Sequence, residues 1–465
     1  MLGVRVVASL FSIRDNTHVF APKRRRMRFL APTLVCFVLL AAQARAQEES
    51  AQAPSLTLHE AIDIALRNHP TIRMGQATVE AAQQRVRQQI TGYLPSGGYV
   101  YTYSRQARPL TSAVGGVDIG GAQQRRTVTQ FFNFNSTNFQ INQLLFDFGK
   151  TLNEIQAAVA ATEASTADLE TTKQDVIFNT KQAYYSVLSS QRLLGVAEET
   201  IRQNQKHLEE AQARFDVGVA PRFDVTRAQV QLSNAELSRV EARNNVALGF
   251  ETLRRAMGQN EPLRVTLLEQ LEHNPVSLSD EAVMQEAYSR RPELESIKAQ
   301  QRASAEQVSA LKKQFLPSVS GTAQYNWTGR EYPLQEGWMW GVTLTMPLFD
   351  SILTTTQLGE AQAIHRNLQA QEENLHQQVT LEVNQGLLNL RRAEESIRVN
   401  EQTVIQAQEN LDLAEGRYAA GVGNIIEVTD SQLAFTLAQA NNIKALYDYK
   451  TALAELEKAV GAPLQ

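Results

Sequence analysis

Residues 417–432 read Arg-Tyr-Ala-Ala-Gly-Val-Gly-Asn-Ile-Ile-Glu-Val-Thr-Asp-Ser-Gln, and a related stretch lies 203 residues earlier. Residues 214–229 read Arg-Phe-Asp-Val-Gly-Val-Ala-Pro-Arg-Phe-Asp-Val-Thr-Arg-Ala-Gln. The arginine, an aromatic residue, Gly-Val, an acid, Val-Thr and a glutamine recur in the same register. Two copies in one register indicate that the chain contains an internal duplication.

Each copy predicts a helix, a tight turn and a second helix. Gly218 and Gly421 stand where the end of a helix needs a positive φ, which glycine adopts at the least cost. Asp224 and Glu427 then fall in the first turn of the next helix, where the helix dipole favours negative charge. Two capped helical hairpins would explain these residues without any further role, so their shared register is the more informative feature.

The rest of the chain divides in the same way twice. Shorter helices are expected over residues 56–89 and 278–314, each interrupted by one proline. A Leu-Pro-Ser phrase follows each of them, at residues 94–96 and again at 316–318. Each half therefore predicts a short helix, two strands, a long helix and a closing helix.

An apolar period of two follows each Leu-Pro-Ser phrase and predicts β-strands. The alternation is clearest through Trp338, Trp340, Val342 and Leu344. The expected strands cover residues 97–107, 127–146, 318–328 and 338–348. Strands of about ten residues with aromatic residues near their ends match transmembrane β-strands. Two ordinary soluble hairpins are the alternative interpretation.

Long helices are expected over Gly149–Phe215 and Ser351–Tyr418, and closing helices over Phe223–Met257 and Ile425–Val460. At 1.5 Å per residue each long helix would extend about 100 Å and would need support along its length. Apolar residues recur every seven positions, which is typical of coiled-coil packing. They are Val187, Leu194, Ile201, Leu208 and Phe215 in the first half, and Val383, Leu390, Ile397, Val404, Leu411 and Tyr418 in the second.

The first 46 residues predict a signal peptide. A basic cluster precedes the apolar run Phe29–Ala42, and Ala44-Arg45-Ala46 matches a signal-peptidase site. Met27 is an alternative start, because the residues before it add nothing that a signal needs. Cys36 is the single cysteine and lies in this segment, so no disulfide or thiol chemistry is expected in the mature chain.

Composition and motifs argue against an enzyme. The formal net charge of −4 does not favour a nucleic-acid partner. The sequence lacks a P-loop, the zinc-protease His-Glu-x-x-His, the Gly-x-Ser-x-Gly of hydrolases and the dinucleotide-binding Gly-x-Gly-x-x-Gly. Its seven histidines are scattered and none has metal-ligand spacing. No catalytic residue, metal or cofactor is therefore expected.

The ordered set of features resembles the TolC family of outer-membrane factors over almost all of residues 55–465. The resemblance implies a mainly helical fold of two repeats, residues 47–265 and 266–465, with a long coiled-coil α-barrel. It also implies a homotrimer in which each copy gives four strands to one twelve-stranded β-barrel in outer-membrane lipid. The implied function is an exit duct that extends into the periplasm. It would serve a tripartite multidrug efflux or type I secretion system, with a periplasmic adaptor protein and an inner-membrane RND or ABC pump as partners.

Within this resemblance the opening stretch lies at the periplasmic entrance. Glu427 and Asp430 match the position of acidic rings that narrow this end, and Asp224 matches an acid that ties neighbouring helix pairs shut. The expected turn and adaptor-docking residues are Arg214, Gly218, Val219, Arg417, Gly421 and Val422. Gly423 stands where the best-known member of the family has a basic residue, so the closing salt bridge is expected to be absent or rebuilt through Arg222 or Arg227.

A periplasmic adaptor protein is the main alternative, since adaptors also carry long helical hairpins. Adaptors have one hairpin between globular β domains, whereas this chain predicts two hairpins and membrane-length strands. A coiled-coil scaffold is a further alternative, against which the strands at matching places in both halves count. The cargo, whether drug, metal ion or polypeptide, stays open.

Overall fold

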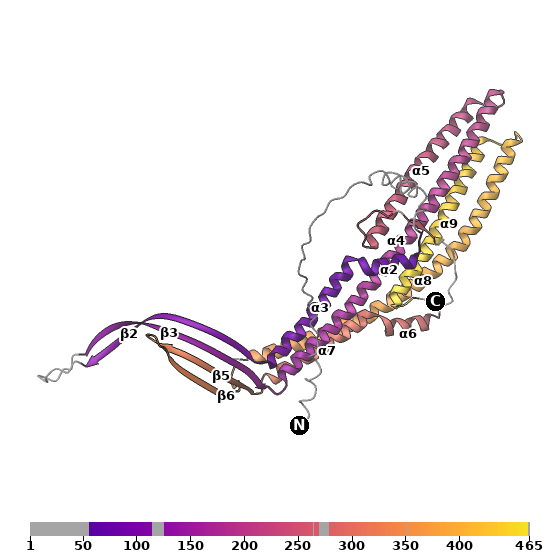
Figure 1. Cartoon of the computed structure of the whole chain (residues 1–465). Helices are drawn as coiled ribbons and strands as arrows, with labels where there is room; N and C mark the ends of the chain where they lie inside the picture. The colour runs from indigo at the N-terminus through magenta and orange to yellow at the C-terminus, as the bar shows by residue number, and fades with distance from the viewer. Residues whose placement is uncertain (1–54, 114–124, 264, 269–278, 351, 464–465) are drawn as a thin grey trace, which may run out of the picture. The chain divides into compact units, whose positions relative to one another are not determined.

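The computed structural model describes residues 55–113, 125–263, 265–268, 279–350 and 352–463. The expected signal peptide lies outside these described residues. One compact unit runs from Ser55 to Gln465. Its elements follow the predicted order of helix, strand pair, long helix and closing helix in each half (Figure 1).

The first half contains two short helices, two long strands and one helical hairpin. Its elements are β1 (Ser55–Leu56), α2 (Leu58–Asn68), α3 (Pro70–Ile90), the 3₁₀ turn η1 (Thr91–Tyr93), β2 (Ser96–Ala113), β3 (Arg125–Phe146), α4 (Lys150–Asp216) and α5 (Arg222–Ala256). The second half repeats this order. Its elements are β4 (Thr266–Leu267), α6 (Asp280–Arg290), α7 (Pro292–Lys313), β5 (Ser318–Gly329), β6 (Gln335–Thr345), α8 (Leu353–Ala419) and α9 (Ile425–Val460).

The first helix of each half breaks immediately before a proline, at His69 and at Arg291. Both residues are extended, because a residue that precedes proline avoids the helical region. A glycine at the end of each closing helix packs against the break. A Cβ added to Gly258 would lie 2.7 Å from the Cα of His69, and one added to Gly461 would lie 3.1 Å from the carbonyl oxygen of Arg290. The same close backbone contact therefore anchors the closing helix in both halves.

Four antiparallel strands form one sheet in the order β2-β3-β5-β6, so the strands of both halves join at β3 and β5 (Figure 1). The register aligns one aromatic residue from each strand. Tyr99 faces Phe139, Phe139 faces Tyr325, and Tyr325 faces Trp338. Because residues that face one another across strands lie on the same side of a sheet, this row crosses the whole sheet on one face.

The strand bounds differ from the expectation at two places. Strand β6 covers Gln335–Thr345 rather than 338–348, because Pro347 has no N–H to donate to a neighbouring strand. Strand β2 continues to Ala113 rather than ending at 107, and Pro109 lies within it. A proline is tolerated there because β2 is an edge strand. The short pair β1 and β4 was not predicted, since two residues carry no periodicity.

An aspartate after each strand pair starts the long helix. The carboxylate of Asp147 accepts from the backbone N–H groups of Gly149 at 3.0 Å and Thr151 at 2.7 Å. The carboxylate of Asp350 accepts from the N–H of Thr354 at 2.9 Å. These bonds satisfy N–H groups that have no partner within the helix. They give a physical reason for the repeated Leu-Phe-Asp phrase.

The long helices α4 and α8 contain 67 residues each. Helix α4 packs on α5, α8 packs on α9, and α4 and α9 join the two hairpins, so the helices lie in the order α5-α4-α9-α8 (Figure 1). The largest core cluster lies where these helices meet α2, α6 and α7, and it includes the fully buried Tyr184, Leu253, Val383 and Tyr449. The hydroxyl of Tyr184 donates to the carbonyl oxygen of Leu56 at 2.9 Å.

Candidate functional site

The two hairpin tips close with the same backbone hydrogen bonds. The glycine N–H donates three residues back, at 2.9 Å for Gly218 and 3.1 Å for Gly421. The next N–H donates five residues back, at 2.9 Å for Val219 and 3.0 Å for Val422. This pair of bonds is the Schellman motif. Both glycines have φ of +74°, which confirms the predicted positive-φ caps.

Apolar side chains point into solvent at both tips. Val219 and Val422 are 72% and 71% exposed. Val217 and Phe223, which flank the first turn, are also exposed. A cluster of exposed apolar side chains, such as the one around the first turn, is typical of a contact surface for another protein.

The second tip is tied to its own closing helix. Arg417, at the end of α8, donates through Nε to the carboxylate of Glu427 at 3.2 Å. Glu427 lies in the first turn of α9, as predicted. Asn424 caps the same helix, because its side-chain oxygen accepts from the N–H of Ile426 at 3.0 Å. Arg417 therefore acts within one hairpin.

Arg227 joins the two hairpins near their tips. From α5 its Nε donates to the hydroxyl of Thr429 on α9 at 3.2 Å, and its guanidinium lies 3.4 Å from the carboxylate of Asp430. Of the two arginines named in the sequence analysis, Arg227 makes this ion pair, and its role as a substitute for a basic residue at position 423 stays a prediction. The side chain of Arg222 makes no ion pair within the described part of the chain.

A second link between the hairpins passes through Tyr418. The guanidinium of Arg214 donates to the carbonyl oxygen of Ala419 at 3.0 Å and lies 4.4 Å from the centre of the Tyr418 ring. Burial, and then the negative charge of Asp224, raise the pKa of Tyr418. The Tyr418 hydroxyl is buried and has no hydrogen-bond partner among the described residues. Burial also raises the pKa of Asp224 itself.

The contact of α4 and α5 with α8 and α9, which includes Arg227 and Tyr418, is called the seam below. A buried histidine lies further along this seam. His207 on α4 is 4% exposed, and its Nε2 lies 3.5 Å from the carboxylate of Glu415 on α8. Burial lowers the pKa of His207, and this outweighs the opposite effects of Glu415 and Glu210, whereas Lys206 lowers the pKa further. His207 is therefore a neutral residue inside a contact between hairpins at neutral pH.

The structure brings some predicted residues together and separates others. Glu427 and Asp430 both lie on the exposed part of α9, whereas Asp224 lies half-buried on the other hairpin. The sequence interpretation missed Tyr418, Thr429 and His207 as members of the seam. One signal was available, because Tyr418 places a hydroxyl where the first copy has the phenyl ring of Phe215.

None of the described helices is apolar over a sufficient length to cross a membrane. No group of three or more His, Cys, Asp or Glu side chains in that part of the chain is arranged to hold a metal ion.

Comparison with known proteins gives consistent matches. The family model for "Outer membrane efflux protein" matches residues 61–259 and 283–462. The outer membrane protein TolC of Escherichia coli is 25% identical over 419 residues, which cover 85% of this chain and 80% of that protein. The outer membrane protein OprJ of Pseudomonas aeruginosa is 25% identical over 426 residues, covering 87% and 84%.

Solved structures share the fold. The outer-membrane channel CmeC of Campylobacter jejuni superposes with a TM-score of 0.74 at 17% identity, over 88% of this chain and 86% of that chain. The outer-membrane channel MtrE of Neisseria gonorrhoeae gives a TM-score of 0.72 at 19% identity, covering 88% and 89%.

These matches decide between the interpretations left open by the sequence. The family is one of channels rather than enzymes, adaptors or scaffolds. Its homology implies a trimeric channel within a tripartite efflux pump. The chain belongs to the outer membrane efflux protein family and is an efflux channel of the outer membrane that extends into the periplasm.

Proposed function

We propose that three copies join edge to edge and that Glu427 and Asp430 form the periplasmic constriction of the resulting duct. Each copy consists of two repeats, residues 47–265 and 266–465. Within one chain, β3 of the first repeat pairs with β5 of the second. Between copies, β6 of one chain would pair with β2 of the next, because these two strands are the free edges of the described sheet. Three copies would then close a sheet of twelve strands.

The helices support the same arrangement. In the order α5-α4-α9-α8 the two outer helices are α5 and α8, and both carry exposed apolar side chains. On α5 these are Val230, Leu237, Val240 and Leu248, and on α8 they are Leu381, Leu388, Val399 and Ile405. Burying such residues against one another is favourable by roughly 25 cal/mol per Å². Helix α5 of one copy would therefore pack on α8 of the next.

The sheet is proposed as the membrane-spanning part. On β6 the residues Trp338, Trp340, Val342 and Leu344 share one face and are 63–72% exposed. The aromatic row that crosses all four strands lies on this face. An apolar face bordered by aromatic residues suits lipid at its boundary with water.

The bridge between Arg227 and Asp430 is the observation that carries the proposed constriction. It places Asp430 on the seam between the hairpins, beside the tip, with Glu427 one helical turn away. Three copies would bring six carboxylates to one ring, and such a ring attracts cations and repels anions. Asp224, on the other hairpin, would help to hold the closed state through Tyr418.

The tips are proposed to dock a periplasmic adaptor protein that links the duct to an inner-membrane pump of the RND or ABC class. Arg214, Gly218 and Val219 build the first tip, and Arg417, Gly421 and Val422 build the second. The exposed valines supply apolar contact area, and the Schellman bonds hold the turns in one shape.

Ion selectivity tests the constriction. Replacing Glu427 and Asp430 with Ala should lower the preference for cations in single-channel recordings, because it removes six negative charges per trimer. Glu401→Ala with Glu409→Ala is the matched control, since it removes as many charges from exposed positions on α8. Equal loss of selectivity in both pairs, or unchanged selectivity in the first, would remove Glu427 and Asp430 from the constriction.

A further inference from the structure

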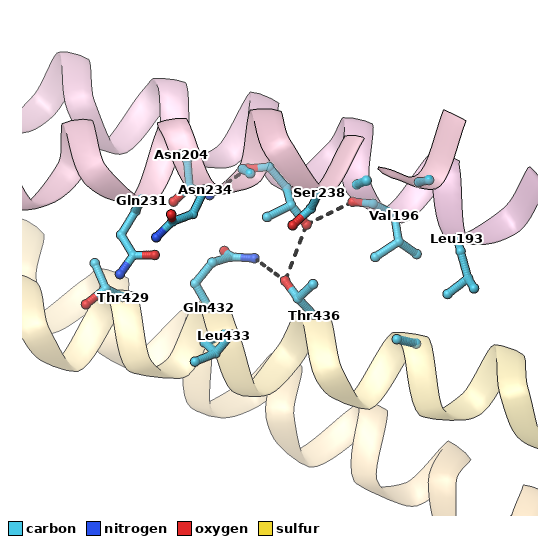
Figure 2. A pocket seen from close by; sticks show the side chains of 15 residues that line it. Leu193, Val196, Asn204, Gln231, Asn234, Ser238, Thr429, Gln432, Leu433 and Thr436 are labelled. Atoms are coloured by element: carbon cyan, nitrogen blue, oxygen red, sulfur yellow. Dashed lines mark hydrogen bonds between the residues drawn. The ribbon is translucent and has the colours of Figure 1, made fainter. Parts of the chain in front are cut away.

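A cavity of about 250 Å³ lies between α4, α5 and α9 (Figure 2). It lies on the seam between the two hairpins, and Thr429, which accepts from Arg227, forms part of its wall towards the tips. All 15 residues that line it within the described chain are uncharged. The cavity therefore differs chemically from the proposed constriction beside it, which is formed by Glu427 and Asp430.

The two ends of the cavity differ. Helix α4 runs towards the tip, and α5 and α9 run away from it, so chain order places each lining residue along the seam. Carboxamide side chains gather at the end near the tips (Figure 2). They belong to Asn204, Gln231, Asn234 and Gln432. Leu193 and Val196 line the other end, with small alanines around them.

The side chain of Gln432 has, in this cavity, a hydrogen-bond acceptor without a donor from the described part of the chain. Its side chain is 3% exposed, and its Nε2 donates to the hydroxyl of Thr436 at 3.3 Å. Its Oε1 is buried and accepts no hydrogen bond from the described residues. A buried acceptor without a donor costs about 1–3 kcal/mol, so a molecule that supplies a donor here gains binding energy.

We propose that the cavity binds a small uncharged carboxamide with a compact apolar body. The amide N–H would donate to Oε1 of Gln432, and the amide oxygen would accept from the carboxamides of Gln231 or Asn234. The apolar body would lie against Leu193 and Val196. The described lining offers no opposite charge to pair with an ion, so an uncharged ligand should bind more tightly than a charged one of the same size.

Occupancy of this cavity affects the seam. The lining residues come from both hairpins, so a bound molecule contacts α4 and α5 on one side and α9 on the other. It resists any change in their spacing and holds the hairpins at one separation. This consequence rests on the proposed constriction, which must widen for transport, whereas the binding itself does not.

Calorimetry with the full-length protein in detergent tests the binding, with benzamide as the probe. Benzoate is the matched ligand control, because it has the same ring and similar size but carries a charge and no N–H donor. Benzamide should bind saturably and at least about 10-fold more tightly than benzoate. Gln432→Leu should weaken benzamide binding about 10-fold. Gln229→Leu, at an exposed position on α5, should leave it unchanged.

Equal binding of benzamide and benzoate overturns the proposal, as does the absence of saturable binding or unchanged binding to Gln432→Leu. Circular dichroism checks that this variant is folded, and Asn234→Leu is the second variant if it is not. Single-channel recording with benzamide then tests the effect on the seam. If benzamide binds but does not change channel opening, the proposed effect on hairpin separation is wrong. The proposed binding and the proposed duct function would both still stand.

Discussion

The two hairpin tips have the same backbone and different side-chain environments. Both end in a Schellman turn with a glycine at φ +74°. They diverge at the residue that follows the arginine shared by both copies, because Tyr418 is 5% exposed whereas Phe215 is 39% exposed. Tyr418 packs beside the first hairpin, where Arg214 covers its ring. Among the described residues, no guanidinium or ammonium group lies over the ring of Phe215.

The difference shows how a duplicated unit becomes an asymmetric pair. The turn geometry depends on backbone bonds and on glycine, so it tolerates changes in the neighbouring side chains. Contacts between hairpins depend on those side chains, and only one side of each hairpin meets the other hairpin in a single chain. Arg417 closes on its own hairpin through Glu427, whereas its counterpart Arg214 reaches across to the carbonyl oxygen of Ala419.

Truncating the two aromatic residues gives the largest expected contrast. Tyr418→Ala should lower the free energy of unfolding by about 3 kcal/mol, because it empties a buried site next to Ile425 and Val428. Phe215→Ala should cost about 1 kcal/mol, since the ring is already partly in water. Urea unfolding in detergent measures both. Equal losses would show that the two tips are equally packed and would contradict the difference between Tyr418 and Phe215 described above.

Much of this fold was predictable from the sequence, because its signals are local. Glycine at a helix end, proline spacing and the change from helical to two-residue periodicity each report on a few neighbouring residues. The sequence offered Arg222 and Arg227 as alternatives for a salt bridge near the tips, but it could not choose between them, because the partner of each depends on how two hairpins 203 residues apart align. Tyr418 appeared as one more residue of the heptad, and although its hydroxyl distinguishes it from Phe215, a hydroxyl alone does not indicate burial near Asp224.

Replacing the turn glycines tests whether the two backbones are equivalent. Gly421→Val and Gly218→Val should each destabilise their tip by about 2 kcal/mol, because a β-branched residue is strained at positive φ. Thermal unfolding and efflux assays measure the effect. Gly416→Val is the control, since this glycine lies in helix α8, a Cβ added to it would meet no atom within 4 Å, and valine suits a helix slightly better than glycine. A large loss at only one tip would mean that side chains, rather than the turn, hold the other.

Removing the bridge between the hairpins should have a smaller effect. Arg227→Ala loses the bonds to Thr429 and Asp430, of which the second is largely exposed and therefore weak. We expect a loss of about 1 kcal/mol, which would raise the population of parted hairpins about 5-fold. Single-channel recording would show more frequent opening.

Arg222→Ala is the matched control for this bridge. It removes the same charge from the same helix, but Arg222 is exposed and makes no ion pair within the described residues. Its opening frequency should equal that of the unmodified protein. More frequent opening in both variants would assign the effect to net charge near the tips rather than to the bridge.

Acid should weaken the seam through His207, and this is the smallest of the expected effects. Burial holds the pKa of His207 below its ordinary value of 6.5. A group with a lowered pKa in the folded state stabilises that state above its unfolded pKa, and this contribution is lost as the pH falls through the folded pKa. Thermal unfolding between pH 7.5 and 5 should therefore show a stability loss that His207→Gln reduces.

The charged neighbours of His207 change the size of this acid-induced loss, so variants of them test its cause. Glu415 and Glu210 raise the pKa of His207, whereas Lys206 lowers it. Glu415→Gln should deepen the acid loss, because protonated His207 would then be buried without its counter-charge. Lys206→Ala should reduce the loss. If acid instead strengthened the seam in the unmodified protein and Glu415→Gln abolished that gain, His207 and Glu415 would form a stabilising ion pair. The contact between His207 and Glu415 would then stabilise the seam in acid, which is the opposite of the effect derived from the burial of His207.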